Sequence, residues 1–253
     1  MSPRLVRRNH GKGHSYRLDG ERVVGVTTAC GNLPKRALVD WAGRVTAEYA
    51  VDHWDELADE PPSSRLNTLT RARYAASTAA ALRGTQIHTL GEAVSHGREV
   101  DAGEHQSEVE AYARFLDRWG VTMIATETPV AHTLYRYAGT ADGWATFDRG
   151  PFAGARVLLD IKTGRGVYDE TALQLTAYRY ADLWQPDGPS SEEPLPPVDA
   201  VAVAHVLTDA VELLPVEADD KQFRQFRYLM ETTRWMDEGP YIGAALDVEA
   251  ASA

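Results

Sequence analysis

Apolar residues recur along the chain with two different periods, and the period changes near residue 120. Before that point they are spaced by three and four residues, as on one face of a helix. The spacing predicts three helices, over residues 34–54, 64–90 and 104–119. In the first helix one buried face is expected, made by Leu38, Trp41, Val45 and Tyr49. The second is rich in Ala and Arg, and Gly84 is expected to interrupt its last third.

Alternation with a period of two predicts strands. Asp19-Gly20 is a turn signal between two extended arms, so residues 14–28 are expected to form a β-hairpin. After residue 120 a meander of four strands is expected, over 121–127, 130–138, 141–148 and 155–162. The pattern then predicts a helix over 169–184, strands over 198–207 and 210–216, a helix over 219–238 and a frayed alanine-rich end. The predicted fold class is α/β (α+β), with a central mixed β-sheet flanked by helices.

The same division predicts the domain organisation. A hairpin and helical region, 1–120, and a sheet with a C-terminal helix, 121–253, are expected to form one integrated domain. With 43% hydrophobic and 25% charged residues the composition is that of a globular protein, and no apolar run reaches the roughly 20 residues that span a bilayer. The basic start lacks the apolar region of a secretory signal. We therefore expect a cytoplasmic protein without a membrane partner.

The net charge of −11 argues at first against a nucleic-acid partner. However, ten acidic residues lie between Asp182 and Asp220 without a single Lys or Arg, so this segment carries nearly all of the net charge. Residues 1–16 are basic and contain no acid, and the stretch from Arg65 to Arg83 is similarly one-sided. A nucleic-acid surface is therefore permitted, and the acidic 182–220 segment is a candidate face for a protein partner or a second copy.

Candidate chemistry is concentrated between residues 139 and 178. Val157 to Leu159 are typical of a buried central strand, and Asp160 and Lys162 follow it on one face because strand side chains alternate. Asp142, expected at the start of a neighbouring strand, supplies a second carboxylate. By itself an Asp-x-Lys pair is also typical of a simple salt bridge.

Further candidates lie on either side of this pair. Gln174 and Tyr178 are four residues apart on a predicted helix and so lie on one side of it. His88 is near the end of the Arg-rich helix, where it could equally be a packed core histidine, and Glu127 precedes Pro129 at a strand edge. The single cysteine, Cys30, excludes any zinc or iron–sulfur site built from several thiolates of this chain.

The order of these motifs resembles the PD-(D/E)XK nuclease superfamily, and more narrowly the RecB-like phage exonucleases related to the CRISPR-adaptation nucleases. The resemblance covers residues 84–180, although Ala141 stands where the superfamily name has proline. It implies a restriction-endonuclease-like core. The motifs that carry it are His88, Gly139-Thr-Ala-Asp142, Asp160-Ile-Lys162-Thr-Gly164 and Gln174-x-x-x-Tyr178.

Residue by residue, the resemblance implies a site that hydrolyses DNA with a divalent metal. Lys162 would orient or deprotonate the attacking water, and Gln174 and Tyr178 would position a phosphate or the DNA end. Mg²⁺ or Mn²⁺ is the expected ion. No iron–sulfur cluster is expected, because the related CRISPR-adaptation nucleases use four cysteines for theirs. The implied metal ligands are His88, Asp142, Asp160 and the backbone carbonyl of Ile161, with Glu127 as a further candidate.

The expected function is a metal-dependent exonuclease on linear single- or double-stranded DNA, a phage or prophage protein that acts in recombination or DNA processing. Two alternatives remain open. One is a nuclease-fold adaptor that binds DNA ends and hands them to a partner. The other is a carboxylate-pair hydrolase on another substrate, which leaves Lys162 and the Gln174/Tyr178 pair unexplained.

Overall fold

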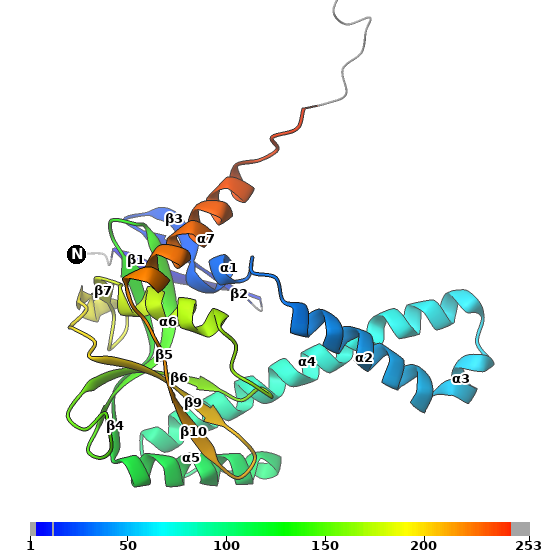
Figure 1. The fold of residues 1–253 in the computed structure, drawn as a ribbon, viewed down its shortest axis with the longest axis horizontal. Coiled ribbons are helices and arrows are strands. Elements are labelled where there is room, and N and C mark those ends of the chain that lie inside the picture. Colours follow the sequence, from blue (N-terminus) through cyan, green and yellow to red (C-terminus); the bar gives the residue numbers. More distant parts are fainter. Residues whose placement is uncertain (1–3, 12, 244–253) are drawn as a thin grey trace, which may run out of the picture.

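A computed structural model of the protein describes residues 4–11 and 13–243 and shows a mixed β-sheet flanked by helices (Figure 1). The predicted fold class is therefore confirmed. The strands are β1 (Leu5–His10), β2 (Gly13–Leu18), β3 (Glu21–Gly25), β4 (Val121–His132), β5 (Tyr137–Phe147), β6 (Arg156–Lys162), β7 (Leu183–Trp184), β8 (Glu193–Pro194), β9 (Ala200–Val206) and β10 (Val211–Pro215). The α-helices are α1 (Val26–Cys30), α2 (Arg36–Asp52), α3 (Trp54–Ala58), α4 (Pro62–Ser95), α5 (Gln106–Trp119), α6 (Glu170–Arg179) and α7 (Asp220–Glu238). Two short 3₁₀ turns are η1 (Gly103–His105) and η2 (Pro189–Ser191).

Strand β5 lies at the centre of the sheet and organises the site. One edge pairs with β4 along nearly its whole length. The other edge pairs in parallel with β3 at Tyr137 and Ala138, and antiparallel with β6 from Gly143 to Thr146. Residues 139–142 have no strand partner on that second edge, so the sheet splits there. β6 continues the sheet through parallel pairing with β9, and β9 pairs with β10.

Two hydrophobic clusters fill the space between sheet and helices. Helices α1, α6 and α7 pack together over one cluster, which contains Trp144, Leu158 and Phe226. The last part of α4 and helix α5 contribute Ile87 and Phe115 to the other. Residues from both predicted regions, 1–120 and 121–253, therefore share the same core.

The predicted four-strand meander is wrong, because the segments 121–127 and 130–138 are not separate strands. β4 runs through Pro129 to His132, and the chain turns only at 133–136. Pro129 lacks an N–H, but its carbonyl accepts a hydrogen bond from Gln185 N at 3.0 Å and stays within the sheet. The real turn contains neither Gly nor Pro, since Arg136 adopts the left-handed conformation itself, with φ 53°. Asp142 is consequently in the middle of β5 rather than at the start of a strand.

Three other predicted boundaries also need correction. The second arm of the hairpin ends at Gly25, and residues 26–30 form helix α1. The helix predicted over 169–184 ends at Arg179 and is followed by the short strand β7. Gly84 does not interrupt α4, which extends over 34 residues. The hairpin turn, the helix ending at Gly120, the strands β9 and β10 and the final helix are confirmed.

Helices α2 and α4 form an arm that extends away from the sheet, with α3 at its far end (Figure 1). The predicted buried face of α2 is wrong: none of its residues is buried, and Leu38 is 50% exposed. The reason is that α2 packs along the first part of α4 rather than on the sheet. Its apolar stripe therefore meets a single neighbouring helix.

Some sequence features lie beyond these elements. Strand β1 was not predicted, because its residues are mostly polar and exposed and only Leu5 is buried. Lys12 and the alanine-rich end at 244–253 lie outside the described residues. Among the helices of the described ranges, none has both the length and the apolar character needed to cross a membrane.

Candidate metal centre

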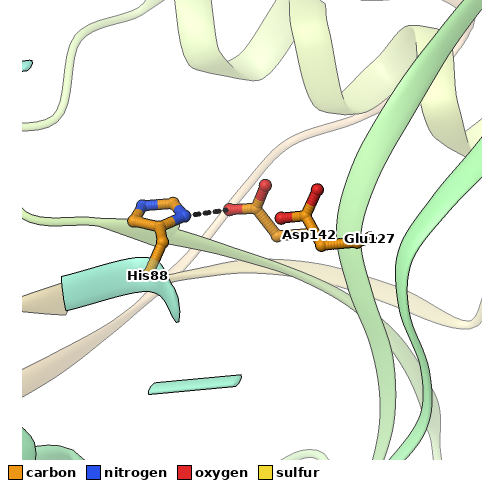
Figure 2. A group of neighbouring side chains, drawn as sticks. All are labelled: His88, Glu127 and Asp142. Atoms are coloured by element: carbon orange, nitrogen blue, oxygen red, sulfur yellow. Dashed lines mark ion pairs between the residues drawn. The ribbon is translucent and has the colours of Figure 1, made fainter. Parts of the chain in front are cut away.

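Three side chains from different elements converge beside the split in the sheet: His88 from α4, Glu127 from β4 and Asp142 from β5 (Figure 2). One ligand atom of each lies within 4.8 Å of the other two. The His88 Nδ1 is 3.7 Å from the Asp142 Oδ2. Because Mg²⁺ binds its ligands at about 2.0–2.1 Å, small side-chain rotations bring all three within reach of one ion.

Helix α4 places His88 through close packing against α5. Ile87, the neighbouring residue, is buried. One turn beyond His88, Gly91 has no side chain, and a Cβ there would lie 3.4 Å from the ring of Tyr112. The end of α4 therefore approaches α5 closely, and the imidazole of His88 is directed to the sheet split.

Glu127 has an unusual backbone conformation for a glutamate. Its φ is 46°, in the left-handed region that non-glycine residues rarely adopt. In the β4–β5 ladder it lies between the pairs Thr126–Gly143 and Thr128–Ala141, so it is opposite Asp142. Although Glu127 is exposed, partial desolvation of its carboxylate by nearby atoms and the negative charges of Asp142 and Glu92 raise its pKa to about 7. Local strain and like charges held together are features that recur at functional sites.

Asp160 and Lys162 form a pair at the end of β6. The carboxylate of Asp160 is completely buried, and its Oδ2 is 2.5 Å from the Lys162 Nζ. Burial and the charge of Asp142 raise the pKa of Asp160, whereas Lys162 opposes the rise. Burial would lower the pKa of Lys162, but the carboxylates of Asp160 and Asp142 outweigh it and raise the pKa above its usual value. The lysine is thus held as a cation, and its side chain is 30% exposed.

The backbone links this pair to the three converging side chains. β5 and β6 stop pairing after Gly143 and Leu159, so the N–H of Ile161 has no ladder partner on β5. The Oδ2 of Asp142 accepts its hydrogen bond at 2.8 Å instead. This bond fixes Asp142 beside the Asp160-Ile161-Lys162 segment. Of the metal ligands implied by the sequence, Asp142, Asp160 and Ile161 therefore come from adjacent backbone at the split, and His88 reaches it from α4.

Gln174 and Tyr178 are on one side of α6, as predicted, but their exposure differs. Tyr178 is only 1% exposed, so its ring cannot lie against DNA. Its hydroxyl is 3.5 Å from the Gln174 Nε2. The ring fits over β5 because Gly139 has no side chain: a Cβ there would lie 2.4 Å from Cε1 of the tyrosine. Gln174 is the member of the pair that is less buried.

Three residues around the turn after Lys162, Arg83, Glu108 and His205, were not given a role in the site by the sequence. Arg83 donates to the carbonyl of Thr163 at 3.1 Å and to the carboxylate of Glu108 at 2.6 Å. His205 Nε2 is 2.8 Å from the carbonyl of Gly164. In the sequence Arg83 ends the basic stretch that permits a nucleic-acid surface, but its guanidinium donates to Thr163 and Glu108 within the protein. His205 is a polar residue in an otherwise apolar strand, and this was the one feature of the sequence that could have identified it as a contact of the turn.

The residues present fit a divalent cation. The donor set of one imidazole and several carboxylates is one that Mg²⁺ and Mn²⁺ accept. Neither oxygen of the buried Asp160 carboxylate has a hydrogen-bond partner among the described residues, and Lys162 is its ionic neighbour. Lys162 is beside the Oδ2 only, so the buried Oδ1 has no partner of its own in the described ranges and is available to bind a cation.

Comparisons with known proteins were made for the whole chain. No family model matches it, and no curated protein matches it. A solved structure described as that of SSO0001 resembles it with a TM-score of 0.36 and 15% sequence identity, over 87% of this chain and 78% of that one. At that TM-score the similarity does not identify a family.

Proposed function

We propose that this protein is a metal-dependent deoxyribonuclease of the PD-(D/E)XK type, an exonuclease that hydrolyses phosphodiester bonds of linear DNA. The observation that carries the proposal is the convergence of His88, Glu127 and Asp142 beside the buried Asp160–Lys162 pair. A simple salt bridge would explain the last two residues alone. It does not explain why a histidine and two further carboxylates gather at the same split in the sheet.

The proposed ligands of Mg²⁺ or Mn²⁺ are the His88 imidazole, the carboxylates of Glu127, Asp142 and Asp160, and the carbonyl of Ile161. When bound, the ion would supply Lewis-acid polarisation of the scissile phosphate and acidify a water. Asp142 has one oxygen committed to the Ile161 N–H, which keeps the carboxylate in a fixed orientation. The protein thereby presents a preorganised set of ligands.

Lys162 supplies the positive charge of the site. Asp160 holds the amine as a cation, and the exposed part of the side chain can donate hydrogen bonds to a phosphate oxygen or to the attacking water. Gln174 offers an amide group from α6, and Tyr178 positions it from within the core. The chain's own residues thus bind the phosphate, orient the water and offset the developing negative charge.

The resemblance in sequence further supports a phage or prophage protein that acts on DNA in the host cytoplasm, in recombination or DNA processing. No iron–sulfur cluster is part of the proposal, because Cys30 is the single cysteine of the chain and is buried.

The experiment is digestion of end-labelled linear DNA, single- and double-stranded, beside a closed circle, with Mn²⁺, Mg²⁺ or EDTA. Asp142→Asn and Lys162→Ala are compared with the wild type. Asp117→Asn and Lys221→Ala provide the same chemical changes at exposed positions away from the site. We expect metal-dependent loss of linear DNA in the wild type and both controls, a spared circle, and at least a hundredfold lower rate in both site variants.

Two outcomes would contradict the proposal. DNA that stays intact under every condition, although the folded protein retains DNA ends, would favour the adaptor function instead. Equal cleavage by Asp142→Asn and by the wild type would place the active site elsewhere.

A further inference from the structure

We propose that Arg83 is a positioning residue for this site: it clamps the turn that follows Lys162 to the helix that carries His88. The inference rests on the proposed nuclease function and deepens it, because it names a residue that acts on the catalytic lysine without touching the substrate.

The first step is the geometry of the guanidinium. Its Nη1 donates to the Thr163 carbonyl at 3.1 Å, and its Nη2 donates to the Glu108 Oε1 at 2.6 Å. Thr163 immediately follows Lys162, and Arg83 lies five residues before His88 on α4. One side chain therefore connects the turn after Lys162 with the helix that carries His88, although Lys162 and His88 are 74 residues apart in sequence.

The second step is the buried anchor. The Glu108 side chain on α5 is only 7% exposed, and the Arg83 guanidinium is its charged partner. A planar guanidinium forms two directed hydrogen bonds at once, which the single ammonium of a lysine cannot reproduce in the same geometry. Glu108 thus holds the planar, fork-shaped guanidinium of Arg83 in the orientation that reaches the Thr163 carbonyl.

The third step is that α4 and the turn are in close proximity. A Cβ at Gly84 would lie 3.4 Å from the Thr163 Oγ1, so the helix backbone comes close to the turn. From the other side, the buried His205 pairs in register with Lys162 and holds the next carbonyl, that of Gly164, at 2.8 Å. Two successive carbonyls after Lys162 are therefore fixed by side chains from α4 and β9.

A lysine at the end of a strand has four rotatable side-chain bonds, so its amine is only as well placed as the backbone that carries it. Displacement of a catalytic group by about 1 Å can reduce a rate about a hundredfold. Loss of the clamp is therefore expected to act on the rate of the chemical step more than on substrate binding.

The test variant is Arg83→Lys, which keeps a positive charge beside Glu108 but removes the fork. Arg114→Lys is the matched control, because this arginine also donates to a backbone carbonyl, that of Asp209, but on an exposed part of α5. For Arg83→Lys we expect kcat to fall about 10- to 100-fold, while KM and the Mn²⁺ dissociation constant stay within about threefold of the wild type. A role confined to the packing of α4 would instead displace His88 and weaken Mn²⁺ binding.

A second readout does not depend on activity. Amide hydrogen exchange of residues 161–166 should become at least tenfold faster in Arg83→Lys than in Arg114→Lys, because the turn has lost one of its two anchors. If Arg83→Lys does not fold, Arg83→Met with Glu108→Leu removes both charges together, which proteins often tolerate. The same changes in kcat and in hydrogen exchange are expected of that double variant.

Unchanged kcat in Arg83→Lys, or exchange in the turn no faster than in the control, would overturn the proposal. Failure of the proposed function looks different: the wild type would cleave no DNA with any metal. In that case the hydrogen-exchange comparison still decides whether Arg83 holds the turn. The proposed role of Arg83 in catalysis would then be wrong together with the proposed function.

Discussion

Glu127 combines a backbone conformation suited to glycine with a side chain suited to a metal ion. Its φ of 46° is unfavourable for a residue with a Cβ, and such a conformation costs about 1–3 kcal/mol. The surrounding β4–β5 ladder enforces it, since the residues on both sides are paired with β5. This conformation places the carboxylate opposite Asp142, so under the proposed function stability is exchanged for the ligand arrangement.

This exchange predicts opposite effects on stability and on metal binding at one position. Glu127→Gly should relieve the strain, and Glu127→Gln, which removes the same charge, should keep it. We expect Glu127→Gly to have a free energy of unfolding about 1 kcal/mol higher than Glu127→Gln, measured by urea denaturation in EDTA. Both variants should bind Mn²⁺ at least tenfold more weakly than the wild type in calorimetric titrations. A glycine variant less stable than the glutamine variant would show that Glu127 is not strained.

The sequence indicated which candidate residues lie close together better than it indicated the contacts between them. Asp160 and Lys162 could be assigned to one face because the period of a strand is fixed, and His88 and Asp142 were found through a motif order. Nothing local indicates that Arg83 reaches a carbonyl 80 residues away, since that contact exists only because α4 lies beside the turn after Lys162.

At the scale of elements, the short helix α1 shows how packing sets chemical behaviour. It spans only five residues, yet Val26, Ala29 and Cys30 are buried beneath α6 and α7. The sequence indicated a strand here, because its β-branched residues continue the pattern of the hairpin. Contacts with two distant helices overrode that local preference.

The burial of α1 predicts an unreactive thiol. Burial, with a smaller effect of the Glu170 charge, raises the pKa of Cys30 from its usual value near 9 to about 12. Because the thiolate is the reactive form, the folded protein should react with a disulfide reagent at pH 8 about a thousandfold more slowly than after unfolding in urea. Between pH 9 and 12 the rate for the folded protein should keep rising about tenfold per pH unit, whereas the rate for the unfolded chain levels off near pH 9. Equal rates in the two states would mean that α1 does not stay packed.

Long elements were predicted well, and the connections between them less so. Helix α5 and strands β9 and β10 have strong periods and clear ends, such as the left-handed Gly120. The β4–β5 turn has no such signal, because Arg136 adopts a positive φ that only its surroundings require. The prediction of a buried face on α2 was wrong for a different reason. The apolar period shows that a helix packs against a partner, but not whether that partner is a sheet or a single helix.

At the scale of the whole molecule, charge is distributed very unevenly. The segment from Asp182 to Asp220 contains ten acids without a Lys or Arg and spans β7 to the start of α7. Some of these acids bind within the protein, as Glu192 does with the N–H groups of Arg4 and Leu5. Others are exposed and accept no side-chain hydrogen bond from the described residues. The negative charges of this segment should repel DNA and help to direct it to the proposed metal centre.

Neutralising the exposed acids of this segment should therefore increase non-specific DNA binding more than an equal charge change elsewhere. The variant is Asp187→Asn, Asp209→Asn and Glu217→Gln, and its control on the helical arm is Glu48→Gln, Asp55→Asn and Asp59→Asn. Both reduce the net negative charge by three, so a difference between them reports the position of the charges. With EDTA present to prevent cleavage, we expect fluorescence anisotropy at low salt to show several-fold tighter DNA binding for the first variant only. At 0.15 M salt, where the Debye length is about 8 Å, the difference should largely disappear. If both variants gain the same affinity, net charge alone governs DNA binding, and the acidic segment has no directing role.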